Sequence, residues 1–185
     1  MQNQINIYKK RRWNLKTGKY LRAVRDRKGY SQENTANLLH VSKQLVSHLE
    51  NDRRNMTEDL AKQSVDAFND AQYGFEIARQ TAKHYVAPLA TTGRAIEWHR
   101  LALEQVFINK TTEAIERIKA FSLVKPPEFI DDNDMVQVKQ KAEELLDVQM
   151  VADSFLTCLE QEYGISIKEC MGSRISTWKE KGWIG

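Results

Sequence analysis

Residues 29–55 read GYSQENTANLLHVSKQLVSHLENDRRN, and this stretch decides the fold of the N-terminal part of the chain. Ser31 and Ser42 are of a type that favours helix N-termini, and each precedes a short segment with apolar residues on one face. These predicted buried faces contain Ala36, Leu39, Leu45, Val46 and Leu49. The dipeptide His40-Val41 is left for a tight turn. Two short capped helices joined in this way form a helix-turn-helix, and Ala36 lets the helices cross closely.

The second of these helices, residues 42–51, has a polar face opposite its buried one. That face presents Lys43, Gln44, Ser47 and His48. Major-groove base edges are read by long or hydrogen-bonding side chains on one short helix. We therefore expect these four side chains to read bases, and double-stranded DNA to be the partner. A metal ion is not expected, because the other histidines have no ligand spacing with His48.

The motif resembles the Cro and lambda-repressor type of helix-turn-helix regulators, the XRE family, over residues 17–70. The residues that carry the resemblance are Ser31-Gln32, Ala36, Val41-Ser42, Gln44, Val46-Ser47, Leu49-Glu50-Asn51 and Arg53-Arg54. The resemblance implies a five-helix, lambda-repressor-like DNA-binding domain, which we place at residues 17–86.

The same resemblance implies roles for individual residues. Contacts to DNA phosphates are expected from Gln32, Ser42, Asn51, Arg53 and Arg54. A structural ion pair is expected between Arg25 and Glu50. Two positions depart from the family pattern. His40 stands where glycine usually takes a left-handed turn, at a cost of roughly 1–2 kcal/mol. Thr35 replaces a usual leucine, which predicts looser packing of the first motif helix.

The positive charge of the chain is concentrated at its N-terminal end. Residues 1–56 contain thirteen Lys and Arg against four Asp and Glu, a net charge of +9, whereas the whole chain carries +3. The remainder is therefore at −6, a distribution typical of a nucleic-acid-binding module attached to another domain. The tail of residues 1–16 contains a basic run of Lys9, Lys10, Arg11 and Arg12. This run is either a solvated tail or an arm on DNA phosphates and the minor groove.

Strand signals are nearly absent, and the sequence predicts an all-α protein. The helical patterns lie at about 17–28, 31–39, 42–51, 57–69, 71–86, 92–121, 132–163 and 166–181. A small, polar stretch at 87–93 marks a boundary, so we expect a helical dimerisation or partner-binding domain at residues 92–185. Its two long helices, joined at Pro126-Pro127, predict an antiparallel hairpin.

The apolar stripes by which these two helices should pack are read from spacings of three, four and seven. They contain Ala95, Trp98, Ala102, Val106, Ile115, Ile118 and Phe121 in the first, and Val138, Ala142, Leu145, Ala152, Leu156, Leu159 and Tyr163 in the second.

The last helical segment has clear start and stop signals. Ser166 with Glu169 predicts a capping box, and Gly182 followed by Trp183 predicts a Schellman-type end. We expect Trp178 and Trp183 to pack on the hairpin, with a knob that binds a partner as the alternative.

Several classes of protein are not expected from this sequence. No apolar run approaches the roughly 18 residues that span a bilayer, so we expect a cytoplasmic, nucleoid-associated protein with no membrane partner. Cys158 and Cys170 lack metal-ligand spacing and are expected to be reduced thiols. Known catalytic motifs are missing, including the P-loop, the dinucleotide turn and the nucleophile elbow. We therefore expect no enzyme activity, no cofactor and no metal.

Together these features predict a sequence-specific DNA-binding transcriptional regulator. We expect a repressor of bacterial, prophage or mobile-element genes that binds a palindromic operator as a homodimer through residues 42–51. The C-terminal helices would supply dimerisation or bind a protein partner. Two alternatives remain: a small terminase-like DNA-packaging subunit of a phage, and the antitoxin of a toxin-antitoxin pair.

Overall fold

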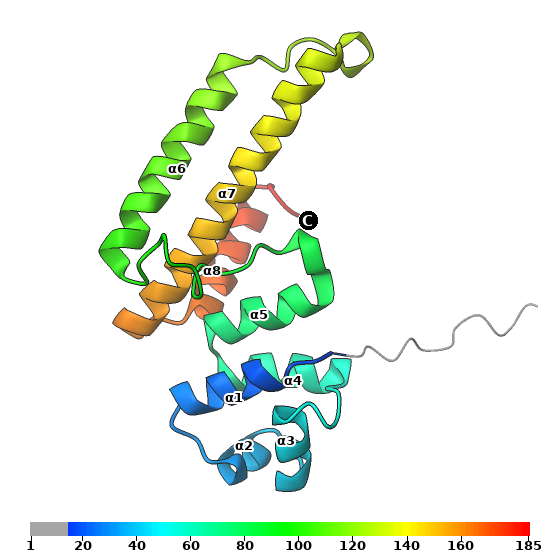
Figure 1. The fold of residues 1–185 in the computed structure, drawn as a ribbon, viewed down its shortest axis with the longest axis vertical. Helices are drawn as coiled ribbons and strands as arrows, with labels where there is room; N and C mark the ends of the chain where they lie inside the picture. Colours follow the sequence, from blue (N-terminus) through cyan, green and yellow to red (C-terminus); the bar gives the residue numbers. More distant parts are fainter. Residues whose placement is uncertain (1–14) are drawn as a thin grey trace, which may run out of the picture. The chain divides into compact units, whose positions relative to one another are not determined.

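The computed structural model describes residues 15–185, and the basic run of the predicted arm, Lys9 to Arg12, lies outside the described residues. The chain divides into two compact units, with the division between Lys83 and His84. Its described part is all-α, as predicted, because the extended pairing found there is one isolated bridge between Leu15 and Met56 (Figure 1).

The described part of the first unit is built of five α-helices around one core. They are α1 (Gly18–Arg27), α2 (Gln32–Leu38), α3 (Lys43–Glu50), α4 (Glu58–Phe68) and α5 (Ala71–Ala82). Helix α1 packs against α3 and α5, and α4 packs against α5. The buried apolar side chains that form the core are Leu15, Leu21, Val24, Leu39, Leu49, Met56, Ala61, Phe68, Tyr73 and Ile77.

Hydrogen bonds tie α4 and α5 to the rest of this core. The Tyr73 hydroxyl lies 2.9 Å from the Ser64 hydroxyl in the interior, and burial raises the pKa of Tyr73 to about 12. Asp70 caps α5 through the backbone N–H of Tyr73 at 2.8 Å. Asp70 also accepts from Arg27 of α1 at 2.7 Å, so one carboxylate fixes both helices.

The second unit is an antiparallel hairpin followed by a shorter helix. The elements are η1 (Lys83–Tyr85) at the junction, α6 (Arg100–Ala120), η2 (Pro127–Phe129), α7 (Asp132–Tyr163) and α8 (Ile167–Glu180). Helices α6 and α7 lie side by side in opposite directions, which confirms the predicted hairpin and its turn.

Two predicted helix ends are wrong. Helix α5 ends at Ala82 rather than at residue 86, and α6 begins at Arg100 rather than at residue 92. Residues 87–99 instead have an irregular conformation and run along the surface of α7. The N–H of Ala90 donates to Ser154 Oγ at 3.0 Å, and the indole N–H of Trp98 donates to Gln161 at 3.0 Å. These contacts with α7 compensate for the helical hydrogen bonds that the segment does not make.

The two predicted apolar stripes are not the surfaces that join α6 to α7. Leu103 and Ala114 of α6 are buried, and Phe107 packs on Phe155 of α7 with ring centroids 6.2 Å apart. On α7 the buried residues include Lys141, Val151 and Cys158. On α7 the predicted residues Ala142, Ala152, Leu156 and Leu159 each directly follow a buried or packed residue, and several residues of both stripes are exposed.

Polar groups fix the register of the hairpin. Arg100 pairs with Glu162 at 2.6 Å, which raises the pKa of Arg100 and lowers that of Glu162. The ammonium of Lys141 donates to the carbonyls of Ile118, at 3.0 Å, and Phe121, at the C-terminal end of α6. A lysine is favourable there because the last carbonyls of a helix lack partners and carry partial negative charge.

The ends of α8 agree with the predicted signals. Ser166 Oγ accepts from the N–H of Glu169 at 3.2 Å, which is the serine half of the predicted capping box. The N–H of Trp183 donates to the carbonyl of Trp178 at 2.8 Å, and Gly182 has a φ of 66°, which together form the predicted Schellman end. The prediction that both tryptophans pack on the hairpin is wrong for Trp183, whose exposed fraction is 66%.

Candidate nucleic-acid interface

Helices α2 and α3 begin at the two predicted serines. Ser31 accepts from the N–H of Asn34 at 3.0 Å, and the Asn34 side chain accepts the Ser31 N–H in return. Ser42 Oγ accepts from the N–H of Leu45 at 3.1 Å and so caps α3. The Ser42 hydroxyl is exposed and keeps its own hydrogen to donate, which is compatible with its predicted place at a phosphate.

The turn between the helices contains His40 in the predicted left-handed conformation, with φ at 51°. The N–H of Val41 donates to the carbonyl of Ala36 at 2.9 Å, and the N–H of His40 donates to Asn37 at 3.2 Å. These two bonds form a Schellman end on α2 and fix the direction in which the chain enters α3. The strain at His40 is the cost of this fixed turn.

Helix α3 is held by one face and open on the other. Val46 and Leu49 are at most 1% exposed, and on α2 Ala36 is 2% exposed, which confirms these positions of the predicted buried face. Leu45, predicted on the same face, is only partly buried. Lys43 and Gln44 are exposed. Ser47 and His48 are half-buried, so they are less accessible to a ligand than the two residues at the start of the helix.

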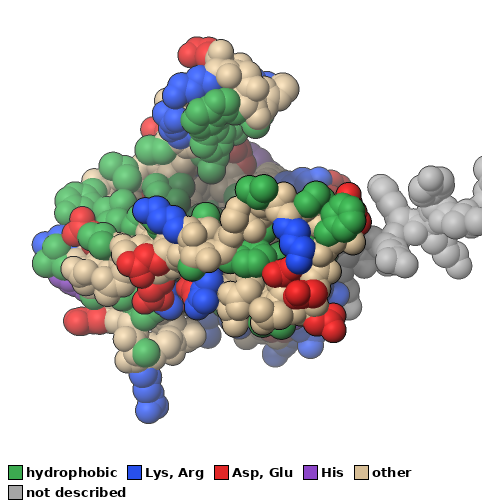
Figure 2. All heavy atoms as spheres, turned by 90° about the horizontal axis from the view of Figure 1, so that it is seen from above, with side chains coloured by type: hydrophobic (Ala, Val, Ile, Leu, Met, Phe, Trp, Pro, Cys, Tyr) green, Lys and Arg blue, Asp and Glu red, His purple; other side chains and the backbone are tan. Residues whose placement is uncertain are grey.

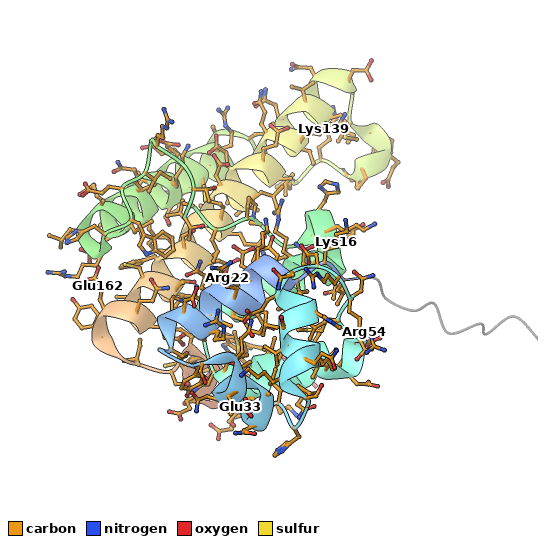
Figure 3. All side chains as sticks on the ribbon, turned by 60° about the horizontal axis from the view of Figure 1, so that its bottom comes forward. Lys16, Arg22, Glu33, Arg54, Lys139 and Glu162 are labelled. Atoms are coloured by element: carbon orange, nitrogen blue, oxygen red, sulfur yellow. The ribbon has the colours of Figure 1, made fainter. Side chains whose placement is uncertain are left out.

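Lys43 already has an acidic neighbour in the protein alone. Its ammonium lies 3.4 Å from the carboxylate of Glu33 on α2, and both side chains are about three-fifths exposed, at 62% and 60%. An exposed ion pair of this kind contributes at most about 1 kcal/mol. Lys43 can therefore exchange Glu33 for another acceptor at little cost. Figure 3 shows Glu33 on α2 and Arg54 just after α3.

The predicted ion pair between Arg25 and Glu50 is present. The guanidinium donates to the carboxylate at 2.5 Å and 3.3 Å, and the Glu50 side chain is 3% exposed. The amide of Gln32 also donates to Glu50, at 2.8 Å. Gln32, predicted to hold a phosphate, thus has one amide hydrogen engaged within the protein and a second one available. The three side chains join α1, α2 and the last turn of α3.

The C-terminal end of α3 is closed by a second Schellman arrangement, with Asp52 at a φ of 51°. The N–H of Arg53 donates to the carbonyl of His48 at 2.9 Å, and the N–H of Asp52 donates to Leu49 at 3.0 Å. The Asn51 N–H and side-chain amide both donate to Ser47 O. The predicted phosphate contact at Asn51 would therefore depend on the second hydrogen of its side-chain amide.

Gly18 and Asp52 fix α3 against α1, and neither residue was predicted to do so. The N–H of Gly18 donates to the Asp52 carboxylate at 3.2 Å. A Cβ at Gly18 would overlap the carbonyl oxygens of Leu49 and Glu50, so the backbones approach as closely as glycine allows. The one sign of this close approach in the sequence is a glycine in the first turn of a predicted helix, where glycine is otherwise unfavourable.

Arg53 and Arg54 follow α3 directly and are exposed. Within residues 15–185 neither guanidinium makes an ion pair. By contrast, Arg25 and Arg27 of the same unit are paired with Glu50 and Asp70. The free positive charge beside α3 is thus carried by the two arginines predicted to contact phosphates.

Comparison with protein families agrees with this geometry. Residues 18–69 match the family model of a helix-turn-helix domain, so this part of the chain is a helix-turn-helix domain. The match agrees with the resemblance to Cro-type helix-turn-helix regulators predicted from the sequence, and it supports a DNA-binding regulator. The matched residues cover less than a third of the chain and leave the second unit unassigned.

Searches of curated proteins and of solved structures found no match. Among the described helices, none is both long and apolar enough to cross a membrane.

Proposed function

We propose that the protein is a sequence-specific transcriptional repressor of bacterial, prophage or mobile-element genes, acting at the nucleoid as a homodimer on a palindromic operator. The observation that carries the proposal is the open face of α3. Its first turn presents Lys43 and Gln44 to solvent, while its opposite face is buried. Its N-terminal end is capped by the Ser42 side chain, and its C-terminal end is closed by backbone hydrogen bonds. A rigid helix with exposed side chains at its N-terminal end is what base reading in the major groove needs.

In the proposed complex the residues divide into two groups. Lys43 and Gln44, with the less accessible Ser47 and His48, read base edges. Arg53 and Arg54, with Gln32, Ser42 and Asn51, contact phosphates and fix the orientation of α3 in the groove. Phosphate contacts act on every sequence alike, whereas a side chain that is bidentate to a base discriminates by about 1–3 kcal/mol.

The proposed symmetry follows from the size of the reading surface. One helix of eight residues contacts few base pairs, and a twofold pair of such helices reads two half-sites about 34 Å apart. A repressor then acts by occupying the operator.

The test begins by selecting bound duplexes from random DNA and measuring affinity for the selected site against a scrambled duplex over a range of salt. Gln44→Ala should weaken binding to the selected site by about 1–3 kcal/mol and leave the scrambled duplex nearly unaffected. Arg53→Ala should weaken both alike and reduce the salt dependence. Arg79→Ala on α5 removes the same charge from a helix that packs on α1 and α4, and it should change neither.

Equal affinity of the wild-type protein for all duplexes would contradict sequence-specific regulation. Wild-type behaviour of Gln44→Ala would show that α3 does not read bases. A mass of eight to ten chains would favour the packaging alternative, and co-purification with the product of a neighbouring gene would favour the antitoxin.

A further inference from the structure

One side of the α6–α7 hairpin is apolar and uncovered. On α6, Ile108, Ile115 and Ile118 are 50%, 45% and 46% exposed, and on α7 Leu145 and Leu156 are 52% and 37% exposed. We call these five residues, together with the exposed Ala142, the open face. Figure 2 shows hydrophobic side chains, in green, lying uncovered among charged ones on the surface of the protein.

The residues of the open face lie on one side of the hairpin. Four of them directly follow a residue that is buried or packed in the hairpin: Ile108 follows Phe107, Ile115 follows Ala114, Ala142 follows Lys141 and Leu156 follows Phe155. Ile118 and Leu145 lie three residues beyond Ile115 and Ala142 and so share their faces. One step along an α-helix turns about 100° around its axis. In two antiparallel right-handed helices, turning in the N-to-C direction from the contact side leads to the same side of the pair.

The opposite side of α7 is covered by the chain itself. Ser154 is fully buried and accepts a hydrogen bond from the N–H of Ala90, and Gln161 accepts one from the indole N–H of Trp98. Residues 87–99 therefore run along this side of α7. The two sides of α7 therefore differ: the chain supplies its own cover for one of them.

The spacing of the open face identifies the kind of surface that fits it. On α6 the row runs through positions 104, 108, 111, 115 and 118, and on α7 through 138, 142, 145, 149, 152, 156 and 159. Both rows alternate steps of four and three, the spacing of helices that pack side by side in a bundle. Glu104 is the one charged residue in the two rows, so the face offers no pattern of charge to select a charged partner.

We infer that the open face binds the open face of a second copy of this chain, so that two hairpins form a four-helix bundle. An uncharged apolar surface is complementary to itself about a twofold axis. The row on α6 is about 21 Å long and the row on α7 about 32 Å, and two helices side by side are roughly 20 Å wide. The resulting face of about 500 Å² on each chain, or about 1,000 Å² in total, reaches the lower limit of a specific interface.

This inference rests on the proposed function, because it supplies the second recognition helix that a palindromic operator requires. The full chain should have twice its mass of 21.5 kDa in light scattering or sedimentation equilibrium. Leu145→Glu and, independently, Ile115→Glu place like charges opposite each other, and each should raise the dimer dissociation constant by about 100-fold or more. Both positions are half exposed, so each chain should keep its helical circular dichroism.

The matched control is Leu146→Glu. Leu146 is 53% exposed and adjacent in sequence, but it points about 100° further around α7 and away from the open face. This variant should remain dimeric. A monomeric wild-type chain, a larger ring, or a dimer that resists both Leu145→Glu and Ile115→Glu would overturn the inference.

DNA binding separates this inference from the proposed function. The Leu145→Glu chain should bind a single half-site as the wild type does, but it should lose the extra affinity for the full palindrome. A monomeric wild-type chain that still prefers its selected site would overturn the inference and leave the function standing. A dimer that binds every duplex equally would do the reverse.

Discussion

Replacing Arg25 should destabilise the first unit more than replacing its partner Glu50. In Arg25→Met the Glu50 carboxylate, 3% exposed, loses both guanidinium bonds and keeps the amide of Gln32 at 2.8 Å. Removing one partner of a buried ion pair costs about 3–5 kcal/mol, because the remaining charge is left without compensation. The Arg25 side chain is 15% exposed, so water can reach the vacated position. We therefore expect about 3 kcal/mol, at the lower end of that range.

In Glu50→Gln the remaining charge has other partners. Arg25 lies 2.8 Å from Asp26 and donates to the carbonyl of Tyr30 at 3.1 Å. Glutamine also keeps one oxygen that can accept from the guanidinium. The loss should therefore be about 1 kcal/mol, the value of an ordinary hydrogen bond. The two variants thus lose different amounts of stability, although both break the same ion pair.

Native-state hydrogen exchange measures this difference locally, because it reports the free energy of opening at individual amides. In Arg25→Met the protected amides of α1 and α3 should exchange roughly 150-fold faster than in the wild type. The amides of α6 and α7, in the other unit, serve as the internal control and should be unchanged. Equal costs for Glu50→Gln and Arg25→Met, or a cost below about 1 kcal/mol for Arg25→Met, would show that the buried Glu50 charge does not depend on Arg25.

Two further substitutions test the packing around the motif. In a urea titration, Gly18→Ala should lower the free energy of unfolding by about 1–3 kcal/mol, because the added methyl group overlaps the carbonyl oxygen of Leu49. The control, Gly93→Ala, should have little effect in the same titration, because a Cβ at Gly93 has open space around it. Thr35→Val should raise the free energy of unfolding by about 1 kcal/mol, because the Thr35 hydroxyl is buried and makes no hydrogen bond within residues 15–185. An unchanged or lower melting temperature of this variant would show that the hydroxyl makes a hydrogen bond in the native protein.

Local chemistry made the helix-turn-helix predictable. Ser31 and Ser42 cap their helices with side-chain oxygens three residues from the N–H groups that they accept, and such contacts need no distant partner. The exposed side chains of α3 followed from the same helical period. The positive φ of His40 was expected from the resemblance alone, since histidine itself does not demand it.

Contacts between distant residues could not be read from the sequence. Gln32 was expected at a phosphate, yet one of its amide hydrogens binds Glu50, eighteen positions away. The need for glycine at position 18 became clear only from the structure, because the backbone of α3 leaves no room there for a side chain.

The sequence by itself determined the helices, their caps and the polar face of residues 42–51, because these depend on neighbours within one or two turns. The tertiary structure alone decided which side of each hairpin helix faces the other. The apolar periodicity predicted that Ala142 packs against α6, but the structure buries the neighbouring Lys141 instead. Lysine can be buried there because its long apolar stem is covered while its ammonium binds the last carbonyls of α6. That one-residue difference turns the predicted stripe of α7 outward and leaves an apolar side of the hairpin free to pack against another copy.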